Sequence, residues 1–105
     1  MIMNTSTTSY YRFKYLTVAE DDNFVVLLGY RLVLTKTEYL ILKALIKSEQ
    51  SPLSTEQIAD LSGIELSKEN IAFHISSINK KAKSISGRLL IKNIVKNGYF
   101  LSEEM

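Results

Sequence analysis

Hydrophobic and polar residues alternate in the first third of the chain and then change to a helical spacing. Residues 10–18 alternate aromatic with basic side chains, the period of two expected of a half-buried strand. Two apolar runs, 24–28 and 31–34, are separated by Gly29-Tyr30, a link that favours a type II′ hairpin. The pattern therefore predicts a small antiparallel sheet of three or four strands.

Two capping signals then predict the starts of two helices. Residues 35–38 and 54–57 each have a Thr or Ser followed three residues later by Glu or Gln, the spacing of a capping box. The first helix is apolar on most sides, so we expect it to be buried, and it ends within 48–52, before a proline. The second is short, runs to about Leu61, and is predicted to turn Ile58 and Leu61 inward.

A third helix is predicted from a cap at Ser67 to about Ser84. The face opposite its apolar stripe holds small and polar groups, with Phe73 as an exposed aromatic and Lys80 as a basic residue. The stripe itself repeats at intervals of four and three and consists of Ile71, Ile75, Ile78, Ala82 and Ile85.

A C-terminal hairpin completes the pattern. Strands are predicted over 89–95 and 99–102, joined by Lys96-Asn97-Gly98, and Asn-Gly is a strong hairpin-turn signal. A sheet, three helices and a hairpin in this order predict an α+β winged helix-turn-helix, with the third helix in the major groove of DNA. We expect this domain to span residues 10–105, after a flexible polar tail at 1–9.

Composition excludes several kinds of chemistry. The 105 residues include no Cys and one His, which argues against disulfides, iron–sulfur clusters and zinc sites, and predicts no cofactor and no metal. There is no Gly-rich phosphate loop or carboxylate pair in a recognisable site, so we predict that the chain is not an enzyme. Asp21-Asp22 is interpreted as a loop turn. No apolar run is long enough for a membrane helix, and we expect a cytoplasmic protein.

The small net charge of +2 hides an asymmetry along the chain. Residues 1–67 carry six Lys/Arg and eight Asp/Glu, a net −2, whereas 68–105 carry seven Lys/Arg and three Glu, a net +4. The positive charge thus falls on the third helix and the hairpin, the two elements that touch the duplex in a winged helix. Phosphate contacts dominate the affinity of such proteins.

Three motifs resemble the OmpR/PhoB-type winged-helix effector domain of bacterial response regulators. They are L-T-x-x-E over 34–38, I-x-x-H-I-x-x-I-x-K-K over 71–81 and I-x-x-I-x-x-x-G-Y-x-L over 91–101. The resemblance covers roughly residues 10–102. It implies a four-stranded N-terminal sheet, transcriptional control in a two-component system, and dimeric binding to tandem sites on double-stranded DNA, with a receiver domain or partner protein outside this chain.

Candidate DNA-binding residues follow from this resemblance and from the basic positions. In the expected recognition helix, about 68–84, and the wing, 89–102, they are Lys68, Asn70, Phe73, His74, Ser76, Ser77, Asn79, Lys80, Lys81, Lys92, Asn93, Lys96, Asn97 and Tyr99. We interpret His74 as a packed or phosphate-flanking residue, not a catalytic one.

The chain departs from the family at positions that commonly hold arginine, namely Glu69, Ser77, Asn79 and Val95. Without arginine in the third helix, the bidentate guanine contact is missing, whereas asparagine pairs with adenine; we therefore hypothesise an A·T-biased site. The same departures leave an alternative open, a winged helix used for protein–protein interaction with weak or no DNA binding. In that alternative the exposed Phe73 packs against a partner instead of contacting bases.

Overall fold

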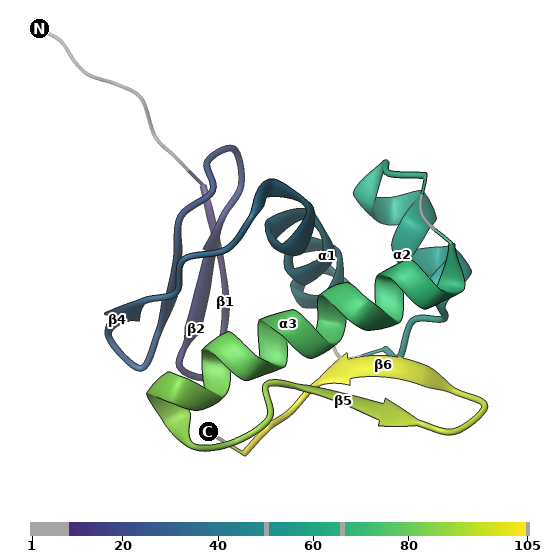
Figure 1. The fold of residues 1–105 in the computed structure, drawn as a ribbon. Helices are drawn as coiled ribbons and strands as arrows, with labels where there is room; N and C mark the ends of the chain where they lie inside the picture. Colours follow the sequence, from purple (N-terminus) through teal and green to yellow (C-terminus); the bar gives the residue numbers. More distant parts are fainter. Residues whose placement is uncertain (1–8, 50, 66, 105) are drawn as a thin grey trace, which may run out of the picture.

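The computed structural model describes residues 9–49, 51–65 and 67–104, so the predicted tail, apart from Ser9, lies outside the described residues. Nine elements follow one another in the order predicted: sheet, three helices, hairpin (Figure 1). Their bounds are β1 Tyr10–Phe13, β2 Leu16–Ala19, β3 Val25–Leu27, β4 Tyr30–Arg31, α1 Lys36–Lys47, α2 Thr55–Ser62, α3 Lys68–Ser86, β5 Ile91–Ile94 and β6 Gly98–Leu101.

The N-terminal sheet has four antiparallel strands in the order β1-β2-β3-β4. The single strand expected over 10–18 is wrong, because this segment forms β1 and β2, paired with Phe13 opposite Leu16. The turn between them contains Lys14, whose φ is 55°. The alternation of basic and aromatic residues runs through this turn unchanged, so hydrophobic pattern alone does not reveal it.

The link between β3 and β4 lies one residue earlier than predicted. Leu27 pairs with Tyr30, so the two turn residues are Leu28 and Gly29 and not Gly29 and Tyr30. Both have positive φ, 53° and 82°. Positive φ at both positions defines a type I′ turn, which follows the right-handed twist of the strands as well as the expected type II′ turn does.

The helix caps form as predicted. The Thr35 and Ser54 hydroxyls each accept a hydrogen bond from the backbone N–H three residues on. The side-chain oxygens of Glu38 and Gln57 in turn accept from the cap backbone N–H, so both capping boxes are present. At Ser67 the side chain accepts from the Asn70 N–H, and α3 extends two residues beyond the predicted end.

Of the two α2 residues predicted to turn inward, Ile58 does so and Leu61 does not. Ile58 is fully buried, but Leu61 remains 63 % exposed. Leu61 lies beside a hollow between α1 and α2 and does not enter the core. A helix as short as α2 presents little more than one buried residue to its neighbours.

In Figure 1 the N-terminal sheet lies at the left, with α1 and α2 to its right and the hairpin below α3. The helix α1 contacts β1 and β2 of the sheet, and also α2, α3 and β6. The helix α3 crosses the front of the molecule, with the β5–β6 hairpin alongside it. Among the described residues, no helix is long and apolar enough to cross a membrane.

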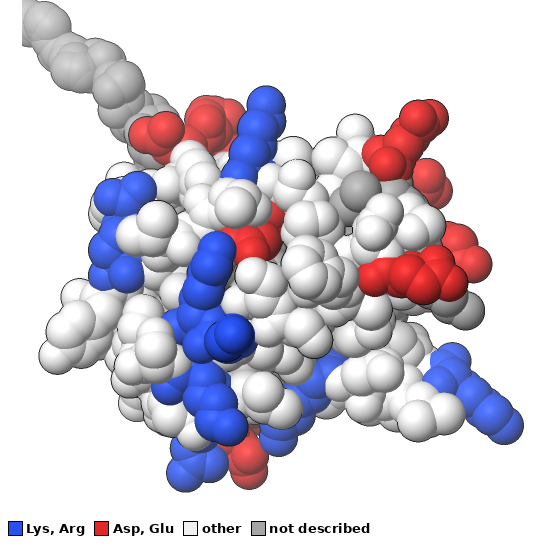
Figure 2. All heavy atoms as spheres, in the orientation of Figure 1, with Lys and Arg blue, Asp and Glu red and all other residues white. Residues whose placement is uncertain are grey.

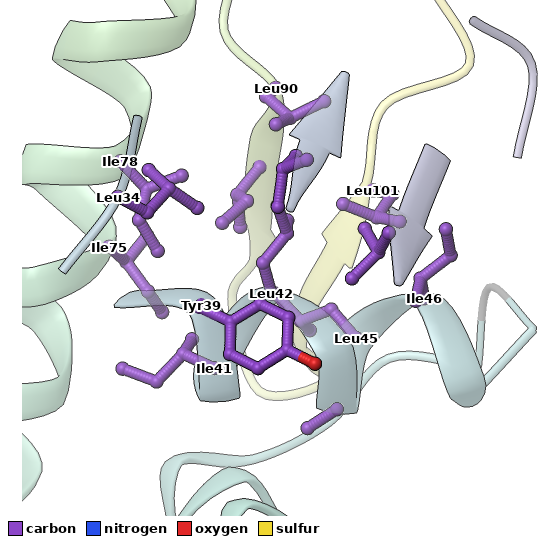
Figure 3. Close-up of a cluster of buried hydrophobic side chains, with 14 of the residues drawn as sticks. Leu34, Tyr39, Ile41, Leu42, Leu45, Ile46, Ile75, Ile78, Leu90 and Leu101 are labelled. Atoms are coloured by element: carbon purple, nitrogen blue, oxygen red, sulfur yellow. The ribbon is translucent and has the colours of Figure 1, made fainter. Parts of the chain in front are cut away.

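The hydrophobic core is centred on α1. Side chains of Ile41, Leu42 and Leu45 lie between Ile75 and Ile78 of α3 and residues of the sheet and hairpin, as Figure 3 shows. All of these are almost completely buried. The predicted α3 stripe is therefore confirmed at 71, 75, 78 and 82, and its packing turns the opposite face of α3 outward.

The wing is attached to the rest of the domain at its β6 end through an isolated backbone bridge. Leu53 and Tyr99 donate to each other's carbonyl oxygen at 2.8 Å. The wing turn spans Ile94–Asn97, with Lys96 at φ 76°, whereas the sequence placed Gly98 in the turn. Gly98 instead begins β6, where a Cβ atom would lie 2.3 Å from the Leu53 carbonyl oxygen, so the bridge requires a residue without a side chain.

Candidate nucleic-acid interface

The side of α3 that faces the wing and the wing itself line an open groove of about 420 Å³. Its floor is apolar, and its rim includes Ser76, Asn79, Lys92, Asn93 and Tyr99 from the predicted set. The core packing of Ile75 and Ile91 positions both walls. The structure thus brings helix and wing residues that are up to 27 positions apart in sequence, Ala72 and Tyr99, around one concave surface.

Beyond the exposed carboxylate of Glu69, the described side chains in the first half of α3 are uncharged. Asn70 and Ser76 are exposed, and Phe73 is 67 % exposed. The His74 ring is half-buried and meets the Phe73 ring edge-on, with 5.5 Å between centroids. The backbone of Lys68 opens the helix, but its side chain lies outside the described residues. This half of the helix can offer amide, hydroxyl and aromatic groups to a ligand.

Three predicted residues of the second half have partners within the protein. Lys81 Nζ lies 2.6 Å from Glu38 Oε1, and Ser77 lies near enough to the same carboxyl to help lower its pKa. Asn79 uses its side-chain amide to hold the backbone of Leu90 and Ile91. Sequence reasoning placed these groups on the helix surface but had no means of seeing their internal partners.

Glu38 is the buried charged group beneath this part of α3. Burial raises the pKa of its carboxyl, but hydrogen bonds from Lys81, Ser77 and the Thr35 backbone outweigh burial and leave the pKa below its ordinary value. The carboxylate therefore stays ionised at neutral pH. Lys80, the neighbour of Lys81, is exposed and makes no ion pair among the described residues.

The wing carries the remaining candidates. Asn93, Lys96 and Asn97 are exposed. Tyr99 is half-buried, and its backbone pairs with that of Leu53, in the segment before α2. Lys92 lies 3.2 Å from Glu104, an exposed ion pair that is easily replaced by another anion.

Two basic residues outside the predicted set also belong to this surface. Lys83 and Arg88 are exposed and, with Lys92, line a hollow of about 290 Å³ at the end of α3. A helical spacing of three from Lys80 to Lys83 was the sequence signal that would have included Lys83. Arg88 lies in the turn after the helix, so only the tertiary structure places it there.

Charge is segregated on the face that Figure 2 shows. Basic side chains gather over the second half of α3 and the start of the wing, and a separate basic group marks the wing tip. Acidic side chains gather over α2 and the start of α3. Among the described residues, no group of three or more His, Cys, Asp or Glu side chains could hold a metal ion.

Comparison with known proteins supports the fold. No protein-family model matches the sequence, and no curated protein matches it. Among solved structures, a streptococcal redox sensor described as evolved from two-component response regulators superposes with a TM-score of 0.75 at 18 % identity, covering 96 % of this chain. The present chain spans 44 % of the length of that protein.

Two further structures match over nearly the whole of both chains. The RstA DNA-binding domain of Klebsiella pneumoniae, solved in complex with the RstA box, gives a TM-score of 0.73 at 18 % identity over 90 % of this chain and 97 % of that one. The C-terminal effector domain of BfmR from Acinetobacter baumannii gives 0.68 at 27 % identity over 96 % of each.

These matches identify the class of the fold. The chain has the winged-helix fold of OmpR/PhoB-type effector domains, and the resemblance seen in its motifs is confirmed at this level. The RstA match is described as a DNA-binding domain and the BfmR match as an effector domain, in agreement with the prediction that the chain is not an enzyme.

Proposed function

We propose that this chain is a sequence-specific double-stranded DNA-binding domain that regulates transcription, with α3 in the major groove and the wing on the phosphate backbone or in the minor groove. The observation that carries the proposal is the outer face of α3. Its side chains at Asn70, Phe73, Ser76 and Lys80 are exposed and take no part in the core. Of these, Ser76 also lines the groove that the wing completes.

The basic surface supports the same function. Lys80, Lys83, Arg88 and Lys96 are exposed and make no ion pair among the described residues. Four cations at the ends of α3 and of the wing suit phosphates on both sides of a groove. Affinity from this number of contacts is moderate and depends strongly on salt.

The base preference rests on the first half of α3. Asn70 is the exposed asparagine that can pair with adenine, and Phe73 can meet a thymine methyl group. We therefore propose an A·T-biased site. Selection from random duplexes checks this: recovered sites with G at the major-groove positions would refute the bias while leaving DNA binding itself intact.

The test of DNA binding is a titration of the chain with random and A·T-rich duplexes at several salt concentrations. Four phosphate contacts predict a slope of log affinity against log salt of about −3.6. Charge reversal at Lys80 and Lys96 should weaken binding to all duplexes alike. A flat salt dependence, or no binding at low salt, would exclude the proposal.

The assembly proposed with this function is a homodimer on tandem sites, with a receiver domain or partner protein beyond this chain and a cytoplasmic location. RstA and BfmR support only the proposal of a further domain, since the matched portions are described as a DNA-binding domain and a C-terminal effector domain of those proteins. Sedimentation of the chain with duplexes carrying one or two half-sites distinguishes a monomer from a dimer on DNA.

A protein-interaction module is the alternative function, and the exposure of Phe73 favours it. An aromatic side chain that is 67 % exposed, next to an acidic helix start at Glu69, also suits a protein partner. If this alternative holds, Phe73→Ala abolishes association with that partner or with a second copy, and the wild-type chain shows little DNA affinity to lose.

A further inference from the structure

We propose that Asn79 is a positioning residue that fixes the wing relative to the recognition helix, so that both reach one duplex in the correct geometry. This inference rests on the proposed DNA-binding function for its consequence, but the geometric claim concerns the free protein. It replaces a base-contacting role for Asn79 with one that acts through the wing.

The side-chain amide of Asn79 spans from α3 to the first residues of the wing. Its Nδ2 donates to the Ile91 carbonyl oxygen at 2.9 Å. Its Oδ1 accepts from the Leu90 N–H at 3.0 Å and from the Ile91 N–H at 2.8 Å. Three of the four hydrogen bonds that an asparagine amide can make are therefore used on two consecutive wing residues.

These bonds lie in a largely dehydrated place. Leu90 and Ile91 are each 2 % exposed, and Asn79 itself is half-buried. If the amide turned toward a base, two buried N–H groups and a carbonyl oxygen would lose their partners. A buried polar group without a partner is costly, and this cost disfavours the base-contacting conformation.

Within the described part of the chain, the other hydrogen bonds that attach the wing to the domain do not reach α3. The Leu53–Tyr99 bridge ties β6 to the segment before α2, and the Ser102 N–H bonds to the Leu90 carbonyl within the hairpin base. Among the described residues, Asn79 supplies the hydrogen bonds that connect an α3 side chain to β5. The orientation of the wing about α3 therefore depends on this amide and on apolar packing, which is not directional.

The three hydrogen bonds that Asn79 makes to Leu90 and Ile91 require an amide side chain. An arginine at this position, which is common in the domains that the sequence resembles, has donors only and cannot accept from the Leu90 and Ile91 N–H groups. An aspartate keeps both acceptor contacts but places a second carboxylate oxygen against the Ile91 carbonyl. The three hydrogen bonds thus depend on a side chain that both donates and accepts.

The absence of cysteine allows a direct test on the free protein. Spin labels are attached at Ser84→Cys and Asn97→Cys, two exposed positions on α3 and at the wing tip, and the distance distribution between them is measured by pulsed electron resonance. We expect a narrow distribution for the parent and a broad one for Asn79→Leu. Asn79→Asp should be intermediate. An unchanged distribution in Asn79→Leu would overturn the proposal.

Duplex affinity is then measured for the unlabelled variants. Asn79→Leu should bind about tenfold more weakly on every sequence, and its salt slope should fall because the wing phosphate contacts are lost. Lys80→Met is the control, since it removes a phosphate contact and leaves the distance distribution narrow. Loss of affinity confined to one sequence, with a narrow distribution, would mean direct base contact and refute the positioning role.

The proposed DNA binding and the role of Asn79 in holding the wing can be refuted independently of each other. If the parent binds no duplex, the proposed function fails, yet the distance measurement still decides whether Asn79 holds the wing. Amide hydrogen exchange provides a second reading that does not depend on labels. The Leu90 and Ile91 amides should exchange faster in Asn79→Leu, while core amides such as that of Ile78 keep their protection; equal loss of protection everywhere would indicate general unfolding and overturn the assignment.

Discussion

Lys81 of α3 donates a 2.6 Å hydrogen bond to Glu38 of α1, and this ion pair joins the candidate recognition helix to the core helix. The Glu38 side chain is 3 % exposed and that of Lys81 is 38 % exposed. Because a buried carboxylate without its cation is costly, Lys81 has a structural reason to stay bound. Of the two adjacent lysines, Lys80 is the one available to phosphate.

Replacement of Glu38 by Gln should destabilise the domain in a pH-dependent way. Gln keeps the capping-box bond to Thr35 but has no charge for Lys81, so we expect a loss of about 1–2 kcal/mol at neutral pH. Since the pKa of Glu38 is lower in the folded state, its stabilisation is present above about pH 4.5 and is lost as pH falls through the folded-state pKa.

Urea unfolding of parent and Glu38→Gln over a series of pH values checks this prediction. The difference in free energy of unfolding should be largest at neutral pH and should narrow in acid. A difference that stays constant from neutral pH down to pH values well below 4.5 would show that the charge on Glu38 contributes nothing.

The adjacent lysines should separate stability from binding. Lys81→Met leaves Glu38 buried without its cation and should lower the free energy of unfolding by about 2–3 kcal/mol. Lys80→Met should change stability by less than about 0.5 kcal/mol and reduce the salt slope of DNA binding by about 0.9. Each variant is the control for the other, and similar effects from both would contradict the assigned roles.

Gly98 should be intolerant of any side chain. In Gly98→Ala the new Cβ would lie 2.3 Å from the Leu53 carbonyl oxygen, at a φ of 113°, so the bridge between Leu53 and Tyr99 must separate. We expect a loss of at least about 2 kcal/mol in the free energy of unfolding.

Gly87→Ala is the matched control for Gly98→Ala. Gly87 has a φ of 75° but nothing lies within 4 Å of an added Cβ, so only backbone strain applies, about 1 kcal/mol. Thermal or urea unfolding measures both. If the two substitutions cost the same, steric exclusion at Leu53 is not what requires Gly98.

Phe73→Ala should leave stability almost unchanged and affect only what the domain binds. With 67 % of Phe73 exposed, we expect a change below about 0.5 kcal/mol in unfolding and a fivefold to tenfold loss of duplex affinity, corresponding to about 1 kcal/mol of apolar contact. Leu61→Ala, at a residue 63 % exposed on α2, is the control and should alter neither. Unchanged duplex affinity in Phe73→Ala would favour the protein-interaction alternative.

Local signals in the sequence were sufficient for the helices and for the order of elements. Capping at Thr35, Ser54 and Ser67 involves residues three apart, and the α3 stripe repeats within one helix, so each is readable without distant contacts. Turns were harder. The residue with positive φ in the wing turn is Lys96, because Gly98 is required elsewhere by Leu53, which lies 45 positions earlier.

For the candidate DNA-binding residues too, some features were predictable from the sequence and others were not. Sequence periodicity by itself determined which face of α3 points outward, since burial of Ile71, Ile75 and Ile78 settles the rotation of the helix. Only the tertiary structure decided which outward residues are free. Asn79 and Lys81 lie beside the wing and α1, and their hydrogen bonds join groups 11 to 43 residues apart. Hydrophobic spacing contains no information about such polar partners, because they depend on how separate elements pack.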